Sequence, residues 1–184
     1  MKIWPLLICL NLFLIACEDA ESKKNTSKPV TESVHYRNDS LHFEINIPQD
    51  WNLRINKNNP KSVGFFEPIQ DSLDAFQENL VIWQEDLPIE LNDSLYAQAA
   101  KTQLQISQPE LKIKSLGWQT LGKDRMDAFQ FDFFTNDSSR YRVYGYTYLK
   151  NRRGYNFSFS TEFHHADAYD SKFKKIIQTF QPLP

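Results

Sequence analysis

The histidines are the residues of this chain that could bind a transition metal or transfer a proton. His164 and His165 are adjacent, whereas His35 and His42 lie far before them in the sequence. Adjacent residues of an extended segment point in opposite directions, which is a poor arrangement for two ligands of one ion. We therefore expect the pair to form a polar turn between a strand and a helix, and we expect no metal site.

Other patterns associated with catalysis are either missing from the sequence or placed where solvation explains them. Carboxylate pairs such as Glu85 with Asp86, and Asp124 with Asp127, fall at expected strand ends and loops. The sequence has no G-x-S-x-G, and its five glycines are too widely spaced for G-x-G-x-x-G or a P-loop. The sequence thus predicts no catalytic residue, no cofactor and no enzymatic activity.

The composition is that of a globular domain with many aromatic rings. The chain has 184 residues, of which 41% are hydrophobic and 14% aromatic, and this length fits one domain. Its 21 basic and 23 acidic residues give a net charge of −2. This balance does not favour nucleic acid as a partner.

The amino terminus resembles the signal peptide of a bacterial lipoprotein. Lys2 precedes an apolar stretch that ends in Leu14-Ile15-Ala16-Cys17, and this stretch is short for a membrane span. In that class the signal is cut before the cysteine, whose sulfur receives a diacylglyceryl group. The resemblance implies that residues 1–16 are removed and that Cys17 is lipidated. A plain secretory signal and an uncleaved anchor are the alternatives.

Lipidation of Cys17 has consequences for chemistry and location. Cys9 is lost with the signal, so no thiol is left for a disulfide, a zinc site or a nucleophile. Acyl chains such as palmitate on Cys17 suffice for stable attachment to a membrane. We expect an envelope protein whose acylated Cys17 binds the outer membrane, on its periplasmic face or at the cell surface.

A flexible linker is expected between the lipidated cysteine and the folded domain. Residues 18–33 are mostly small or charged and cannot bury enough apolar surface to fold. We assign residues 17–40 to the lipidated cysteine and linker, and residues 41–184 to one domain. The cluster of Glu18, Asp19 and Glu21 resembles the surface-export signal of Bacteroidetes lipoproteins, and a merely solvated linker is the alternative.

Hydrophobic periodicity predicts an α+β fold with the element order ββββαββββα. The first four strands are expected at residues 41–47, 51–55, 63–69 and 80–87, the first two paired as a hairpin. A helix is expected at 95–106, and four more strands at 111–121, 126–134, 141–150 and 155–163. A final amphipathic helix begins near Asp167. Short connections between strands favour antiparallel pairing, which gives a central sheet flanked by helices.

The last expected hairpin suggests a contact surface. We expect a type I turn at residues 151–154 with Gly154 in the left-handed region, which would pair Asn151 with Tyr155. This register places three tyrosines among small polar residues on one face: Tyr144, Tyr146, Tyr148, Ser158 and Ser160. The candidate contact surface consists of these five residues, and burial of the rings in the core is the alternative.

Several packing motifs resemble the PsbP-like family. They include Ile47-Pro48 with Trp51, the Asn79-to-Ile82 strand, Ser94-Leu95 with Ala99-Ala100, and a terminal helix that closes on Thr179-Phe180. The family contains the photosystem II extrinsic protein, DcrB-type bacterial envelope proteins and a eukaryotic Ran-binding relative. The resemblance covers residues 41–182 and implies an antiparallel sheet between helices, without catalytic residues.

Two classes of function follow from these observations. The first is a lipid-anchored, non-enzymatic binding or accessory module of the envelope, with an envelope protein as its partner. Immunity to an envelope-directed toxin would be a variant of this role. The second is a small-ligand carrier or hydrolase-type enzyme with a pocket at the sheet edge. A deep pocket lined by histidines or carboxylates would favour the second class.

Overall fold

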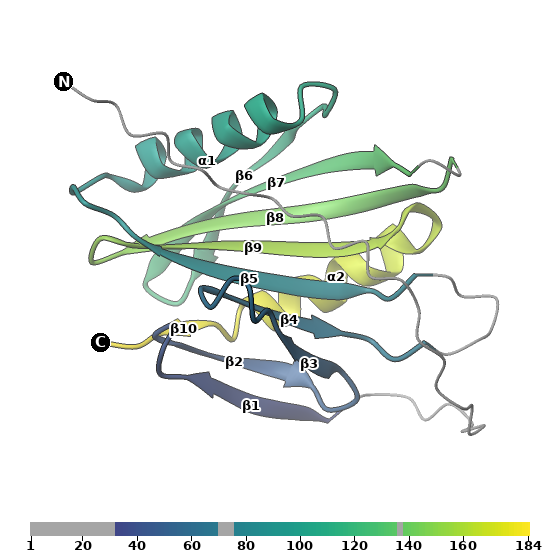
Figure 1. The fold of residues 1–184 in the computed structure, drawn as a ribbon, viewed down its shortest axis with the longest axis horizontal. Helices are drawn as coiled ribbons and strands as arrows, with labels where there is room; N and C mark the ends of the chain where they lie inside the picture. Colours follow the sequence, from purple (N-terminus) through teal and green to yellow (C-terminus); the bar gives the residue numbers. More distant parts are fainter. Residues whose placement is uncertain (1–31, 70–75, 136–137) are drawn as a thin grey trace.

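The fold combines two antiparallel sheets with two α-helices (Figure 1). The structure is a computed structural model and describes residues 32–69, 76–135 and 138–184. The strands are β1 (Ser33–Asn38), β2 (Phe43–Pro48), β3 (Asn52–Ile55), β4 (Ser62–Phe66), β5 (Asn79–Asp86), β6 (Lys114–Leu121), β7 (Asp124–Phe134), β8 (Arg140–Lys150), β9 (Arg153–Glu162) and β10 (Gln181–Pro182). The helices are α1 (Asp93–Ser107), the 3₁₀ turn η1 (Phe163–His165) and α2 (Ala166–Ile177). The predicted α+β class with a central antiparallel sheet is confirmed.

The larger sheet has seven strands in the order β3-β4-β5-β9-β8-β7-β6, and all of its pairings are antiparallel. Strand β5 pairs with β9, with Asn79 opposite Ser160, although α1 and three strands lie between β5 and β9 in the sequence. The expected strand of residues 80–87 therefore lies near the middle of the sheet. This pairing brings the segment before β5 next to the end of β9.

The smaller sheet, in the order β1-β2-β10, corrects two expectations. Strand β2 pairs with β1 and β10, whereas β3 pairs with β4, so the predicted hairpin of residues 41–47 and 51–55 is wrong. The chain instead passes from one sheet to the other after Pro48. Strand β1 also lies inside residues 17–40, which were expected to be linker, because Val34 and Tyr36 alternate with polar residues and pair with Ile47 and Ile45.

One face of the large sheet packs against α2 and the small sheet. Phe173, Ile176 and Ile177 of α2 are buried there, because they recur at helical spacing and form one apolar stripe. Phe43 of β2 and Phe180 enter the same cluster, with ring centroids 5.7 Å apart. The main hydrophobic core therefore lies on this side, which we call the α2 face.

The opposite side, which we call the α1 face, lies beneath α1. The side chain of Asn92 accepts a hydrogen bond from the Leu95 amide and caps the helix, which begins two residues before the expected start at residue 95. Of the α1 residues only Tyr96 and Ala97 are buried. A small cluster of Phe129 and Phe131 with their neighbours forms the apolar part of this face.

Candidate functional site

The β8–β9 turn sets the position of the predicted contact surface. Asn151 and Arg152 both have positive φ angles, 51° and 61°, so the turn is a two-residue loop of the I′ kind. Lys150 pairs with Arg153, and the predicted pairing of Asn151 with Tyr155 is wrong. This difference exchanges the two faces of β9 relative to β8.

The predicted contact surface of Tyr144, Tyr146, Tyr148, Ser158 and Ser160 is therefore withdrawn. The tyrosines lie opposite Phe159, Phe157 and Tyr155 on the α2 face, with only 4%, 2% and 2% of their surface exposed. The two serines lie opposite Gly145 and Val143, on the α1 face. The five residues do not form one surface.

Two of the three buried tyrosines have hydroxyls that reach polar partners. Tyr144 donates to the Ala166 carbonyl at 3.1 Å, and Tyr148 donates to Asp124 Oδ2 at 2.7 Å. Burial raises the pKa of Tyr148, and its hydrogen bond to the Asp124 carboxylate raises it further. All three rings are structural parts of the core, and the hydroxyls of Tyr144 and Tyr148 lie where a partner exists.

The α1 face contains a cavity between the helix and the sheet. Its volume is about 50 Å³, and it is lined by Trp83, Phe129 and Phe131 from the sheet and by Ala100 and Leu104 from α1. Among the described residues that line it, none is acidic, basic or a histidine. Small-molecule sites commonly measure about 300–1,000 Å³. This cavity is a packing gap beneath α1.

Polar contacts attach the start of α1 to the sheet beside this cavity. The Tyr96 hydroxyl donates to Glu85 Oε1 at 2.8 Å and accepts from Asn156 Nδ2 at 2.7 Å. Burial raises the pKa of Tyr96, and the nearby Glu85 charge adds to this effect. Lys101 of α1 forms an ion pair of 2.8 Å with the buried Asp127. The helix is thereby fixed at two points.

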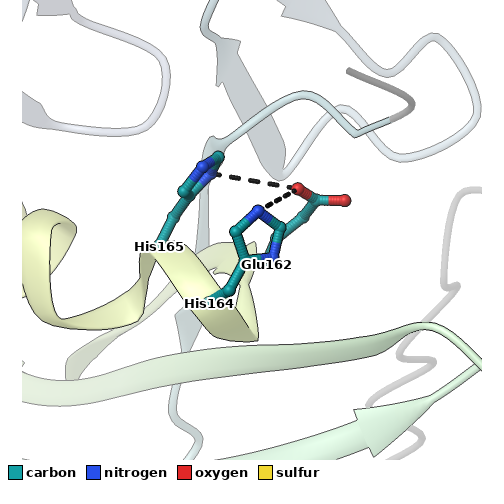
Figure 2. A group of neighbouring side chains, drawn as sticks. All are labelled: Glu162, His164 and His165. Carbon is teal, nitrogen blue, oxygen red and sulfur yellow. Dashed lines mark ion pairs between the residues drawn. The ribbon is translucent and has the colours of Figure 1, made fainter. Parts of the chain in front are cut away.

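Glu162, His164 and His165 lie close enough together to bind one metal ion (Figure 2). Among the described residues, no other group of three or more histidine, cysteine or acidic side chains does so. The two histidines lie in η1 rather than in an extended segment, so their predicted opposite orientation is wrong. Their ring centroids are 4.0 Å apart. Glu162 Oε2 lies 3.3 Å from His164 Nε2 and 3.9 Å from His165 Nδ1. The 3₁₀ turn therefore gathers three donor atoms.

Glu78 adds a second carboxylate to this cluster from a distant part of the sequence. Its residue is only 3% exposed, and its Oε1 accepts a hydrogen bond of 3.0 Å from the Thr161 hydroxyl. The same oxygen lies 3.4 Å from His165 Nδ1. We call Glu78, Glu162, His164 and His165 the His–Glu cluster. Sequence analysis missed Glu78, since only the β5–β9 register places it there.

The residues around η1 fix the position of its backbone. Arg140 and Arg142 lie over the Phe163 ring at 3.4 and 4.6 Å from its centroid. Both arginines also donate to Asp132, at 2.6 and 2.8 Å. Burial of the Asp132 carboxyl opposes ionisation, but the hydrogen bonds and charges of the arginines outweigh it and lower its pKa. The segment between Glu162 and His164 is thus clamped to β8.

The residues predicted to carry the lipid anchor lie outside the described part of the chain. These are residues 1–16, Cys17 and the acidic cluster after it. Among the described helices, none combines the length and apolar character required to cross a membrane. Lipidation of Cys17 stays a prediction from the sequence.

No protein-family model matches the chain, and no curated protein matches it. Several solved structures do. The solution structure of cyanobacterial PsbP (CyanoP) from Synechocystis sp. PCC 6803 matches 87% of this chain and 98% of its own, with 15% identity and a TM-score of 0.56. LpqN, involved in cell envelope biogenesis of Mycobacterium tuberculosis, matches 83% of this chain and 91% of its own, with 13% identity and a TM-score of 0.60.

A eukaryotic protein shares the same architecture. The Ran-binding protein Mog1p of Saccharomyces cerevisiae matches 84% of this chain and 97% of its own, with 6% identity and a TM-score of 0.58. These likenesses show that the chain has a PsbP-like fold, as the packing motifs of the sequence predict. Identities this low establish the fold alone.

Proposed function

We propose that this protein is a lipid-anchored accessory module of the bacterial cell envelope, which acts by binding another envelope protein. The lipid anchor is Cys17, after removal of residues 1–16. The membrane is its first partner, through the acyl chains. The folded domain, which the linker holds near the membrane, is the part that contacts the second partner.

The observation that carries this proposal is the fold shared with LpqN and Mog1p. LpqN is involved in cell envelope biogenesis, and Mog1p binds Ran. The same architecture thus serves an envelope process in one protein and protein binding in another. The lipoprotein signal of this chain agrees with an envelope location. Fold alone does not determine function, so the anchor and the partner each need a direct test.

The interior of the domain favours this role over a small-ligand carrier or a hydrolase-type enzyme. The α2 face is filled by aromatic rings, and the cavity on the α1 face holds about 50 Å³ between neutral side chains. A carrier needs several times this volume. A larger hollow of about 850 Å³ beside the β8–β9 turn has charged walls that include Asp93, Asp124 and Lys150, but it is wide open to solvent and does not enclose a ligand. No residue of the His–Glu cluster lines the cavity on the α1 face, and the two histidines of the cluster are exposed at the surface.

Lipid attachment is tested by labelling cells with a palmitate analogue and fractionating them. The wild-type chain is expected to take up the label and to sediment with membranes. The Cys17→Ala variant is expected to lose the label and to leave the membrane fraction. Cys9→Ala is the matched control, because Cys9 is removed with the signal, and it should behave as wild type. Label retained by Cys17→Ala would show that the anchor assignment is wrong.

The accessory role is tested by crosslinking in living cells, followed by purification of the tagged chain from solubilised membranes. We expect one envelope protein to be crosslinked reproducibly to the anchored chain, and less of it to the Cys17→Ala variant. Native mass spectrometry of the same preparation tests the alternative role, that of a small-ligand carrier. A bound small molecule in place of a protein partner would overturn the accessory role and favour the carrier.

A further inference from the structure

We propose that Glu162, His164 and His165 bind one divalent ion of the zinc class, with the carboxylate of Glu78 beside them as a second negative charge. The fourth coordination position is open to water or to a donor atom from another molecule. This site is separate from the accessory role and does not depend on the lipid anchor. It follows from the positions of Glu162, His164 and His165 at the junction of β9 and η1 (Figure 2). Glu78 reaches them from the segment before β5.

The distances between the donor atoms are close to those of a tetrahedral site. Zinc binds histidine nitrogen and carboxylate oxygen at about 2.0–2.2 Å, which places tetrahedral ligands about 3.3–3.6 Å apart. His164 Nε2 and Glu162 Oε2 are 3.3 Å apart, and His165 Nδ1 and Glu162 Oε2 are 3.9 Å apart. All three donor atoms lie within 4.8 Å of one another. Binding would require rotation of the exposed imidazole rings to shorten the longer distances.

The kinds of donor atom favour zinc over the hard cations. Calcium and magnesium prefer sites built from oxygen, whereas imidazole is a ligand suited to zinc, copper and nickel. Two imidazoles and one carboxylate that leave a position open form a ligand set in which zinc can still accept a water molecule. The His164 and His165 side chains are 68% and 44% exposed, so an ion from solvent can reach them.

Glu78 gives this group the electrostatic setting of a cation site. Its nearly buried carboxylate faces His165 Nδ1 at 3.4 Å, the nitrogen that also faces Glu162. The Thr161 hydroxyl fixes its orientation through a hydrogen bond of 3.0 Å. A bound divalent cation would be attracted by both carboxylates. Because Glu78 faces the nitrogen that would bind the ion, and not the other ring nitrogen that outer carboxylates commonly hold, it acts through its negative charge.

The backbone that carries the ligands is ordered by its neighbours. Phe163 lies between Glu162 and His164 in the sequence, and two arginines of β8 cover its ring. The η1 turn continues directly into α2, whose Phe173 is fully buried. Binding would therefore need adjustment of exposed side chains rather than of the chain itself, which limits its entropic cost.

The test is a metal titration of the purified full-length chain carrying Cys9→Ala and Cys17→Ala, so that no thiol competes for the ion. Zinc affinity is measured by competition with a chromophoric chelator, and Co²⁺ is added as a spectroscopic probe. We expect one ion per chain and the visible absorption of a tetrahedral Co²⁺ site. His164→Ala and His165→Ala should each weaken zinc binding at least about tenfold.

A matched control uses another exposed histidine beside a carboxylate. His35 Nε2 lies 3.5 Å from Glu44, and His35→Ala should leave zinc affinity and the Co²⁺ spectrum unchanged. Failure of the intact chain to bind one zinc ion, or retention of full affinity when both His164 and His165 are replaced, would overturn the site. An equal loss in the His35→Ala variant would overturn it as well.

The role of Glu78 is tested by Glu78→Gln, which keeps an oxygen that can accept from Thr161. Zinc affinity should fall about tenfold and the Co²⁺ spectrum should shift, since the ligands remain but the nearby charge is lost. Circular dichroism and thermal unfolding confirm that each variant is folded. A folded Glu78→Gln variant with the wild-type affinity and spectrum would remove Glu78 from the site.

Discussion

The α2 face and the α1 face of the seven-stranded sheet are covered in different ways. On the α2 face, the helix buries Phe173, Ile176 and Ile177 among aromatic rings of the sheet. On the α1 face, the helix buries Tyr96 and Ala97, and a cavity of about 50 Å³ lies beneath it. One helix is attached mainly by apolar packing and the other has a larger share of polar contacts.

This difference predicts where the domain tolerates change. Apolar contacts of fully buried rings contribute several kcal/mol each, whereas one hydrogen bond contributes about 1 kcal/mol net. The α2 face should therefore supply most of the free energy of unfolding. The α1 face should be the side where local opening costs least, because few buried apolar contacts resist it.

The largest effect is expected from Phe173→Ala on the α2 face. The Phe173 ring is 0% exposed and lies against Phe159 and Tyr144, with centroid distances of 4.6 and 5.9 Å. Its removal leaves a cavity and should lower the free energy of unfolding by about 3–5 kcal/mol in urea titrations. Ile106→Ala on α1 is the control, since Ile106 is 66% exposed, and should change it by less than about 0.5 kcal/mol. Equal losses would refute the contrast between the helices.

A smaller effect is expected from Tyr96→Phe on the α1 face. Loss of the hydroxyl removes one partner each from Glu85 and Asn156. Leaving two polar groups less satisfied should cost about 1–3 kcal/mol of unfolding free energy. Hydrogen exchange should also increase in α1 but not in α2. Tyr144→Phe, which loses the bond to the Ala166 carbonyl, provides the comparison and should cost less. A larger loss of unfolding free energy in Tyr144→Phe than in Tyr96→Phe would show that polar contacts stabilise the α2 face more than the α1 face.

Periodicity was sufficient to predict most of the elements, but it missed β1 and β10 and did not give all of the strand pairings. Phe173, Ile176 and Ile177 recur at helical spacing, and this pattern reflects the one-sided burial that α2 has in the structure. Strand β1 has a weak apolar pattern, since only Val34 and Tyr36 are apolar within it. Its pairing depends on the arrangement of the whole fold. The sequence therefore predicts the fold class while misplacing the hairpin of β2.

The predicted contact surface is wrong because the β8–β9 turn determines the register of the two strands. Asn151 and Arg152 both adopt positive φ angles, which asparagine does readily and arginine does rarely, so Gly154 was the more plausible left-handed residue. The predicted turn, with Gly154 left-handed, would place the opposite face of β9 beside the tyrosines. The buried tyrosines were therefore predicted to lie beside Ser158 and Ser160 on a contact surface. The His–Glu cluster was missed for a similar reason, since the local conformation at His164 is a 3₁₀ turn rather than a strand.

The cavity on the α1 face allows a test of opposite sign. Ala100→Leu places a larger apolar side chain at the cavity and should raise the free energy of unfolding by about 0.5–1 kcal/mol. Ala97→Leu is the matched control on the same helix, because Ala97 is buried and does not line the cavity. Overpacking there should lower stability by about 1–3 kcal/mol. Thermal unfolding measures both, and destabilisation by Ala100→Leu would show that the cavity cannot accept the side chain.

The smallest effect concerns the polar end of the α2 face and depends on pH. Hydrogen bonds from Lys150 at 2.6 Å and Tyr148 at 2.7 Å lower the pKa of Asp124. A lowered folded-state pKa stabilises the fold above the unfolded value of about 3.9, and this stabilisation is lost as the pH falls through the folded-state pKa. Asp124→Asn should therefore flatten the acidic limb of the stability profile.

The Asp124 side chain is 36% exposed, so solvent screening limits the change at neutral pH to less than about 1 kcal/mol. Lys150→Met separates the two donors, because it removes the charge and keeps the Tyr148 bond. The free energy of unfolding of Lys150→Met is measured by urea unfolding between pH 3 and pH 7. The acidic limb of this profile should lie between those of wild type and Asp124→Asn, about 0.5 kcal/mol from either. If Asp124→Asn retained the wild-type slope, the carboxylate would not contribute to the acid stability of the α2 face. If Lys150→Met matched Asp124→Asn, the buried tyrosine hydroxyl would have no influence on it, and the polar end of this face would be a surface ion pair alone.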